Sequence, residues 1–163
     1  MERQGPSTPP HPPESLCRHD PECWVFDVDA TLVDAMTGSS LRPGARQILE
    51  HLRSSAVRVI WWSAGGEDHA RRRAAATGVS ELVDEFHAKK ERGCDGRYRT
   101  DHFLAEGSRP IFVDDSPADL PAGGLRIAVF PYISASFHDR GLAPVARAAG
   151  LVKPSEEPGQ GQP

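Results

Sequence analysis

Cysteines, aromatic residues and long apolar stretches are all scarce in this chain of 163 residues. It contains three cysteines (Cys17, Cys23 and Cys94), and aromatic residues make up 7% of the sequence. Three cysteines without a recognisable spacing do not indicate a disulfide framework, and no secretory leader pattern is present, so we expect a cytoplasmic protein. No apolar stretch approaches the ~20 residues of a membrane-spanning helix, so we expect no membrane partner.

An excess of basic residues is missing as well. The chain has 19 Lys and Arg residues against 23 Asp and Glu residues, which gives a formal net charge of −4. Proteins that bind nucleic acids or anionic membranes carry basic patches, and the overall balance indicates neither partner.

Proline is concentrated at the two ends of the chain. Residues 1–22 contain the stretch PSTPPHPP, and residues 152–163 contain KPSEEPGQGQP. Both ends have too few apolar residues to offset the entropy of ordering, so we predict a disordered arm over 1–22 and a disordered tail over 152–163. Residues 23–151 suit one compact domain, which we expect to hold any catalytic site.

Within this domain, short runs rich in Val, Ile, Phe and Trp alternate with helical patterns. The predicted strands are 23–28, 57–62, 82–86, 110–114 and 125–130. The predicted helices are 43–55, 66–78 and 142–149. This alternation is typical of α/β proteins, and we predict a doubly wound, Rossmann-like parallel sheet with helices on both faces.

Three of the predicted strands carry polar residues at their carboxyl ends or directly after them. These residues are Asp27 and Asp29, Ser63, and Asp114 and Asp115. In a parallel sheet these ends share one edge, where four acids would repel one another without a cation. We therefore predict a Mg²⁺ site with Asp27, Asp114 and the main-chain carbonyl of Asp29 as ligands, and with Asp115 as a further ligand or a partner of the ligands.

These residue types suit phosphoryl transfer. Asp27 is ionised at neutral pH and can attack phosphorus, while Asp29 can protonate the leaving group and later deprotonate a water molecule. Ser63 and the main-chain amide of Ala64 are predicted to bind phosphoryl oxygens. Lys89 or Lys90 should supply a positive charge, and the sequence does not favour one over the other.

Four stretches of the chain resemble, in order, the motifs of the haloacid dehalogenase-like superfamily. They are DVDATLVD at 27–34, VIWWS at 59–63, HAKK at 87–90 and IFVDDSP at 111–117. The resemblance implies a Mg²⁺-dependent phosphatase that works through an aspartyl phosphate. Three stretches, LRPGARQILEHL at 41–52, CDGRYRTD at 94–101 and VDDSP at 113–117, are also similar to the capless branch that includes phosphatases of the RNA polymerase C-terminal domain. The lysine of that branch would fall near Thr100.

The spacing of the motifs leaves no room for a separate cap domain. Only a loop and one helix fit between Asp34 and the second strand, and only about 25 residues separate the third strand from Asp114. The site should therefore be open, which slightly favours a macromolecular phosphate substrate over a small one. The oligomeric state and the substrate identity stay undetermined.

Two other functions are compatible with the same residues. A catalytically silent module could keep the fold and the metal and bind a partner, and a dehalogenase would use Asp27 without Asp29 or metal. The run Arg71, Arg72 and Arg73 is interpreted as the solvated face of its helix, because three consecutive side chains cannot point in one direction.

Overall fold

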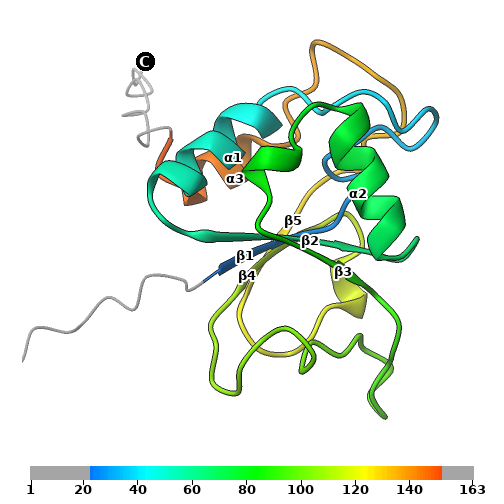
Figure 1. Cartoon of the computed structure of the whole chain (residues 1–163), viewed down its shortest axis with the longest axis vertical. Coiled ribbons are helices and arrows are strands. Elements are labelled where there is room, and N and C mark those ends of the chain that lie inside the picture. The colour runs from blue at the N-terminus through cyan, green and yellow to red at the C-terminus, as the bar shows by residue number, and fades with distance from the viewer. Residues whose placement is uncertain (1–22, 152–163) are drawn as a thin grey trace, which may run out of the picture.

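A computed structural model describes residues 23–151, and the predicted arm and tail lie outside the described residues. Five parallel strands form one sheet in the order β3-β2-β1-β4-β5 (Figure 1). The strands are β1 (Cys23–Phe26), β2 (Arg58–Ser63), β3 (Glu85–Ala88), β4 (Ile111–Asp114) and β5 (Leu125–Ala128). The predicted doubly wound parallel sheet is confirmed.

The two faces of the sheet are covered in different ways. Three α-helices lie on one face (Figure 1): α1 (Ala45–Ser54), α2 (Glu67–Ala76) and α3 (Ala143–Ala148). The opposite face is covered by the largely irregular chain between β3 and β4 and by the 3-10 helix η2 (Pro117–Asp119). Within residues 23–151, helical cover on that face is limited to one short 3-10 turn, whereas the sequence predicted helices on both faces.

The third strand begins three residues later than the sequence predicted and ends two residues later. Residues 82–86 were expected to form it, but a second 3-10 helix, η1 (Ser80–Leu82), occupies the beginning of that range. Leu82 and Val83 are buried in the core on the α-helical face, so their apolarity reflects packing of a connecting segment. A short apolar run does not by itself distinguish a strand from a buried turn.

Alternate side chains of the strands build two separate cores. Trp24, Phe26 and Trp61 pack on the face that carries the α-helices. Val25, Ile60 and Trp62 point to the other face, because successive side chains of a strand alternate. Both Trp61 and Trp62 are buried in these cores.

The neighbouring strands β1 and β4 determine where the candidate site lies. The chain moves from β1 through β2 to β3, and then returns to the other side of β1 to form β4. The crossovers diverge at this point, and ligands of such sheets bind beyond the carboxyl ends of the diverging strands. Asp27 directly follows β1 and Asp114 ends β4, so both acids lie at this switch point.

The described connections contain no separate cap. Residues 27–57 form a loop with isolated bridges and then α1, and residues 89–110 contain no helix or strand apart from a bridge between Arg92 and Tyr98. None of the helices in residues 23–151 is long and apolar enough to cross a membrane.

Candidate active site

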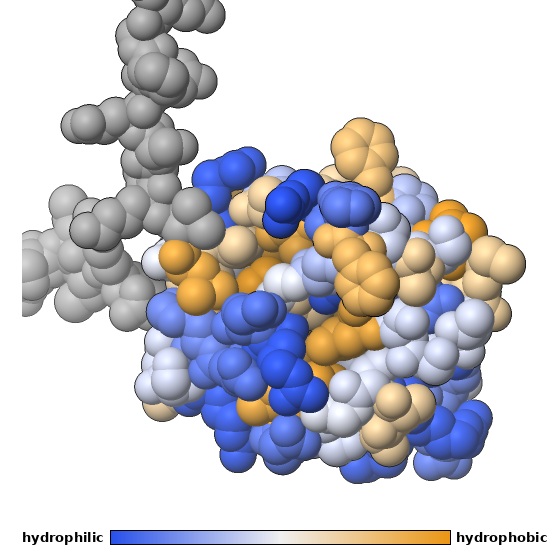
Figure 2. All heavy atoms as spheres, turned by 90° about the horizontal axis from the view of Figure 1, so that it is seen from above, coloured by the Kyte–Doolittle hydropathy of each residue, from blue (hydrophilic) through white to orange (hydrophobic). Residues whose placement is uncertain are grey.

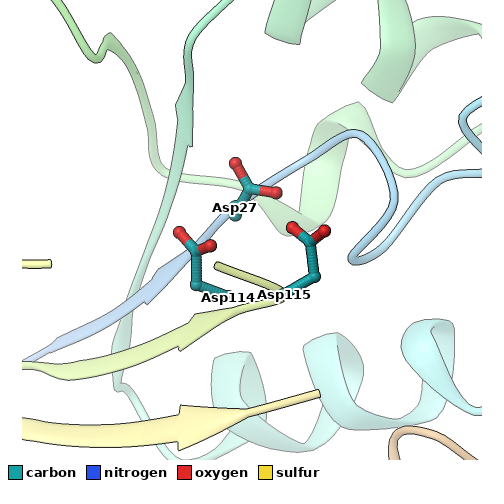
Figure 3. A group of neighbouring side chains, drawn as sticks. All are labelled: Asp27, Asp114 and Asp115. Carbon is teal, nitrogen blue, oxygen red and sulfur yellow. The ribbon is translucent and has the colours of Figure 1, made fainter. Parts of the chain in front are cut away.

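Three carboxylates converge at the carboxyl edge of the sheet. Asp27, Asp114 and Asp115 each offer one oxygen, and these three oxygens lie within 4.8 Å of one another (Figure 3). Asp27 and Asp114 are buried, and Asp115 is half-buried. The sequence predicted Asp27 and Asp114 as metal ligands and Asp115 as a further ligand or a partner of the ligands, and the structure brings all three into one group.

A threonine that the sequence analysis did not assign to the site connects two of these carboxylates. The hydroxyl of Thr31 donates to Oδ2 of Asp27 at 2.9 Å and accepts a hydrogen bond from the main-chain amide of Asp115 at 3.1 Å. Thr31 is fully buried and lies four residues after Asp27, at the first turn of the loop that leaves β1. Its side chain therefore holds the ends of β1 and β4 in register at the site.

The structure separates the two lysines that the sequence could not distinguish. The ammonium of Lys89 donates to Oδ1 of Asp27 at 2.6 Å and to Oδ2 of Asp114 at 2.7 Å, and its side chain is 7% exposed. Lys90 is exposed. Lys89 follows β3 at the same edge of the sheet, which explains how its side chain reaches both acids.

One lysine does not neutralise the three acids. Burial raises the pKa of Asp27 to about 6, with the repulsion of Asp114 in the same direction and the attraction of Lys89 in the opposite one. Burial would lower the pKa of Lys89, but the carboxylates of Asp27 and Asp114 outweigh it and raise that pKa. A group of carboxylate oxygens that keeps an excess of negative charge fits a hard divalent cation.

Ser63 and Ala64 lie on the wall of the same pocket. Ser63 ends β2 and is buried, and its hydroxyl oxygen accepts a hydrogen bond from the amide of Gly65 at 3.1 Å. The pocket has a volume of about 240 Å³. Its lining residues are Asp27, Asp29, Ser63, Ala64, Lys89, Tyr98, Asp114, Asp115, Ser116 and Asp119.

Asp29 lines this pocket without joining the group of three acids. Its carboxylate accepts a hydrogen bond from Nε of Arg73 at 3.0 Å and lies 2.6 Å from Nε2 of His69. Both partners come from α2, and sequence reasoning missed both. The interpretation of the arginine run as a solvated face holds for the exposed Arg72 and is wrong for Arg73.

A weak signal for these two partners was present in the sequence. His69 and Arg73 are four residues apart, so they share one face of a helix. The rotation of α2 relative to the loop after β1 decides whether that face meets Asp29. Packing of Ala70 and Ala74 against the sheet sets this rotation, which only the tertiary structure shows.

Comparison with known proteins identifies the fold. No protein-family model and no curated protein matches the chain. A haloacid dehalogenase-like hydrolase from Streptococcus pneumoniae superposes with a TM-score of 0.56 at 13% identity, over 78% of this chain and 98% of the other. An uncharacterized protein from Listeria monocytogenes serotype 4b superposes with a TM-score of 0.54 at 16% identity, over 78% and 96%. The chain therefore has the haloacid dehalogenase-like fold that its four motifs predicted.

Proposed function

We propose that this protein is a Mg²⁺-dependent phosphomonoester hydrolase that transfers the phosphoryl group to Asp27. The observation that carries the proposal is the convergence of Asp27, Asp114 and Asp115 on one point, with the ammonium of Lys89 against two of them. Phosphoryl transfer to an aspartate needs a carboxylate nucleophile beside positive charge, and both are present at this edge of the sheet.

The metal would be held by Asp27, Asp114 and Asp115, with the main-chain carbonyl of Asp29 as a further oxygen ligand. When bound, Mg²⁺ lowers the repulsion between the nucleophile and the phosphate and stabilises charge on the phosphoryl oxygens. Lys89 adds a fixed positive charge, and the hydroxyl of Ser63 and the amide of Ala64 can donate to the remaining oxygens.

In the first step, an oxygen of Asp27 forms a bond to phosphorus while the bond from phosphorus to the leaving oxygen breaks. Asp29 gives its proton to that leaving oxygen. In the second step, Asp29 takes a proton from water, which attacks the phosphorus and releases inorganic phosphate from Asp27. Both steps need Asp29 beside the phosphoryl group, and Asp29 lines the pocket that contains Asp27 and Ser63.

The surroundings of the pocket support a macromolecular substrate. The two loops that follow β1 and β5 lie side by side, since the amide of Met36 donates to the carbonyl of Ile133 at 3.0 Å. Met36 and Ile133 are 74% and 53% exposed, and Phe130 and Phe137, in the second loop, are more exposed still. Figure 2 looks down on the side of the molecule where these two loops lie in Figure 1, and it shows apolar side chains at that surface. Exposed apolar residues beside an uncapped site offer contact area to a large substrate.

The test is hydrolysis of an aryl phosphate by the wild-type protein, with Mg²⁺ and with EDTA. We expect Mg²⁺-dependent phosphate release that Asp27→Asn abolishes while the fold is preserved. Asp68→Asn is the matched control, because Asp68 is an exposed acid on α2. Full activity of Asp27→Asn would refute the proposal.

Two outcomes would point to the other functions. Mg²⁺ binding without phosphate release from any phosphoprotein, phosphopolymer or metabolite would favour a silent binding module. Activity toward haloacids that EDTA leaves unchanged would favour a dehalogenase.

A further inference from the structure

Both carboxylate oxygens of Asp29 are engaged by side chains of α2. Oδ1 accepts from Nε of Arg73, and Oδ2 lies 2.6 Å from Nε2 of His69. When Asp29 is ionised, as it must be to take a proton from water, its carboxylate only accepts hydrogen bonds, and Nε2 of His69 then donates to it. The ionised carboxylate of Asp29 thus has two hydrogen-bond donors, Nε2 of His69 and Nε of Arg73.

Two glycines leave room for these side chains. A Cβ on Gly65 would lie 2.7 Å from the imidazole ring of His69, and a Cβ on Gly38 would overlap the guanidinium of Arg73. Gly38 also adopts a φ of +64°, which L side chains rarely adopt. The backbone on both sides of the pair thus accommodates the two side chains.

Arg73 also connects Asp29 to the loop of residues 34–41. Its Nη1 donates to the main-chain carbonyl of Thr37 at 3.2 Å. The side chains of Arg73 and His69 are each 25% exposed, so water competes only in part for these contacts. One helix therefore positions the carboxylate of Asp29 and the loop that follows it.

We propose that His69 and Arg73 are positioning residues that hold the carboxylate of Asp29 for its acid and base steps. This inference rests on the proposed phosphatase function, in which Asp29 exchanges protons with the leaving group and with water. A side chain bound at two oxygens by two donors has one orientation, whereas a free aspartate beside an open pocket has several. Loss of either donor lowers the share of molecules in which Asp29 can act.

The consequence depends on the leaving group. General acid catalysis contributes roughly 10²–10⁴-fold where the leaving oxygen needs a proton. An alkyl phosphate needs that proton, whereas p-nitrophenolate leaves without it. A defect in placing Asp29 should therefore appear mainly with alkyl phosphates in kcat/KM, which reports the step that forms the aspartyl phosphate.

The experiment compares Arg73→Ala and His69→Ala with the wild-type protein on both substrate classes. For alkyl phosphates we expect kcat/KM to fall by about tenfold or more in each variant, and for p-nitrophenyl phosphate by less than about threefold. Arg72→Ala is the matched control, since Arg72 is an exposed neighbour on the same helix, and it should behave as the wild type. Arg73→Lys and His69→Gln keep a donor and should recover part of the loss.

A second measurement separates positioning from a general structural effect. In an Asp29→Asn background, Arg73→Ala should cause no further loss of kcat/KM, because the group that it positions no longer exchanges protons. Equal losses on both substrate classes, or an additive loss on top of Asp29→Asn, would overturn the inference. An inactive wild-type protein would overturn the proposed function, and the inference with it. An active wild type with unaffected His69→Ala and Arg73→Ala variants would overturn the inference alone.

Discussion

The raised pKa of Asp27 predicts that the affinity for Mg²⁺ falls when the pH is lowered from 7.5 to 5. Burial is the main cause of the shift, and the neighbouring carboxylate of Asp114 adds to it. A protonated carboxyl does not bind the metal, so protons compete with Mg²⁺ at Asp27 in acid solution. An acid with a raised pKa keeps its proton to a higher pH, so the affinity for Mg²⁺ is lost as the pH falls through about 6.

The size of the effect follows from the same pKa. With a pKa of about 6, Asp27 is about 97% ionised at pH 7.5 and about 9% ionised at pH 5. The apparent dissociation constant for Mg²⁺ should therefore rise about tenfold over this range through Asp27 alone. An aspartate with the ordinary value of 3.8 would stay about 94% ionised at pH 5 and would leave the constant almost unchanged.

Isothermal titration of the metal-free protein with MgCl₂ at both pH values measures this change. Asp68→Asn serves as the control and should show the same dependence as the wild type, because Asp68 is exposed on α2. A dissociation constant that is the same at pH 5 and pH 7.5 would refute the reasoning. The metal-free protein should also lose stability as the pH rises from about 4 to 6, because only the folded state holds the proton on Asp27 in that range.

Two further predictions concern the supports of the site. Thr31→Val removes the hydroxyl that joins Asp27 to Asp115, so it should weaken Mg²⁺ binding and cost about 1–3 kcal/mol in urea unfolding, while Thr31→Ser should behave as the wild type. Asp139→Asn removes the charge that pairs in two hydrogen bonds with the buried Arg42, and should cost about 2 kcal/mol in the same assay at pH 7. Arg42 lowers the pKa of Asp139, so the difference in unfolding free energy between the wild type and Asp139→Asn should shrink as the pH falls below about 4. A difference that stays constant with pH would show that the charge of Asp139 is not its cause.

The acids of the site were predictable because they follow strands in the sequence. Asp27, Asp114 and Asp115 come directly after apolar runs, and parallel strands must bring their carboxyl ends to one edge. Ser63 was predictable for the same reason. The backbone of the sheet places these residues, and the apolar runs that form its strands can be recognised in the sequence.

The partners of these acids were not predictable in the same way. Lys89 and Lys90 are neighbours in the chain, and only the pleat and twist at the end of β3 decide that Lys89 turns toward Asp27. Thr31 reaches Asp115 across 84 residues of sequence. Arg73 stands in a run of three arginines that resembles an ordinary solvated helix face.

The sequence alone determined the order of strands and helices along the chain, the edge of the sheet where chemistry can occur and the carboxylates gathered there. This was possible because apolar runs, and the acids at their carboxyl ends, can be recognised within a short stretch of sequence. The tertiary structure decided which lysine contacts the acids, how Asp29 is held and what covers the second face of the sheet. These depend on the rotation of α2 and the path of the irregular chain between β3 and β4, which are set by packing between residues far apart in the sequence.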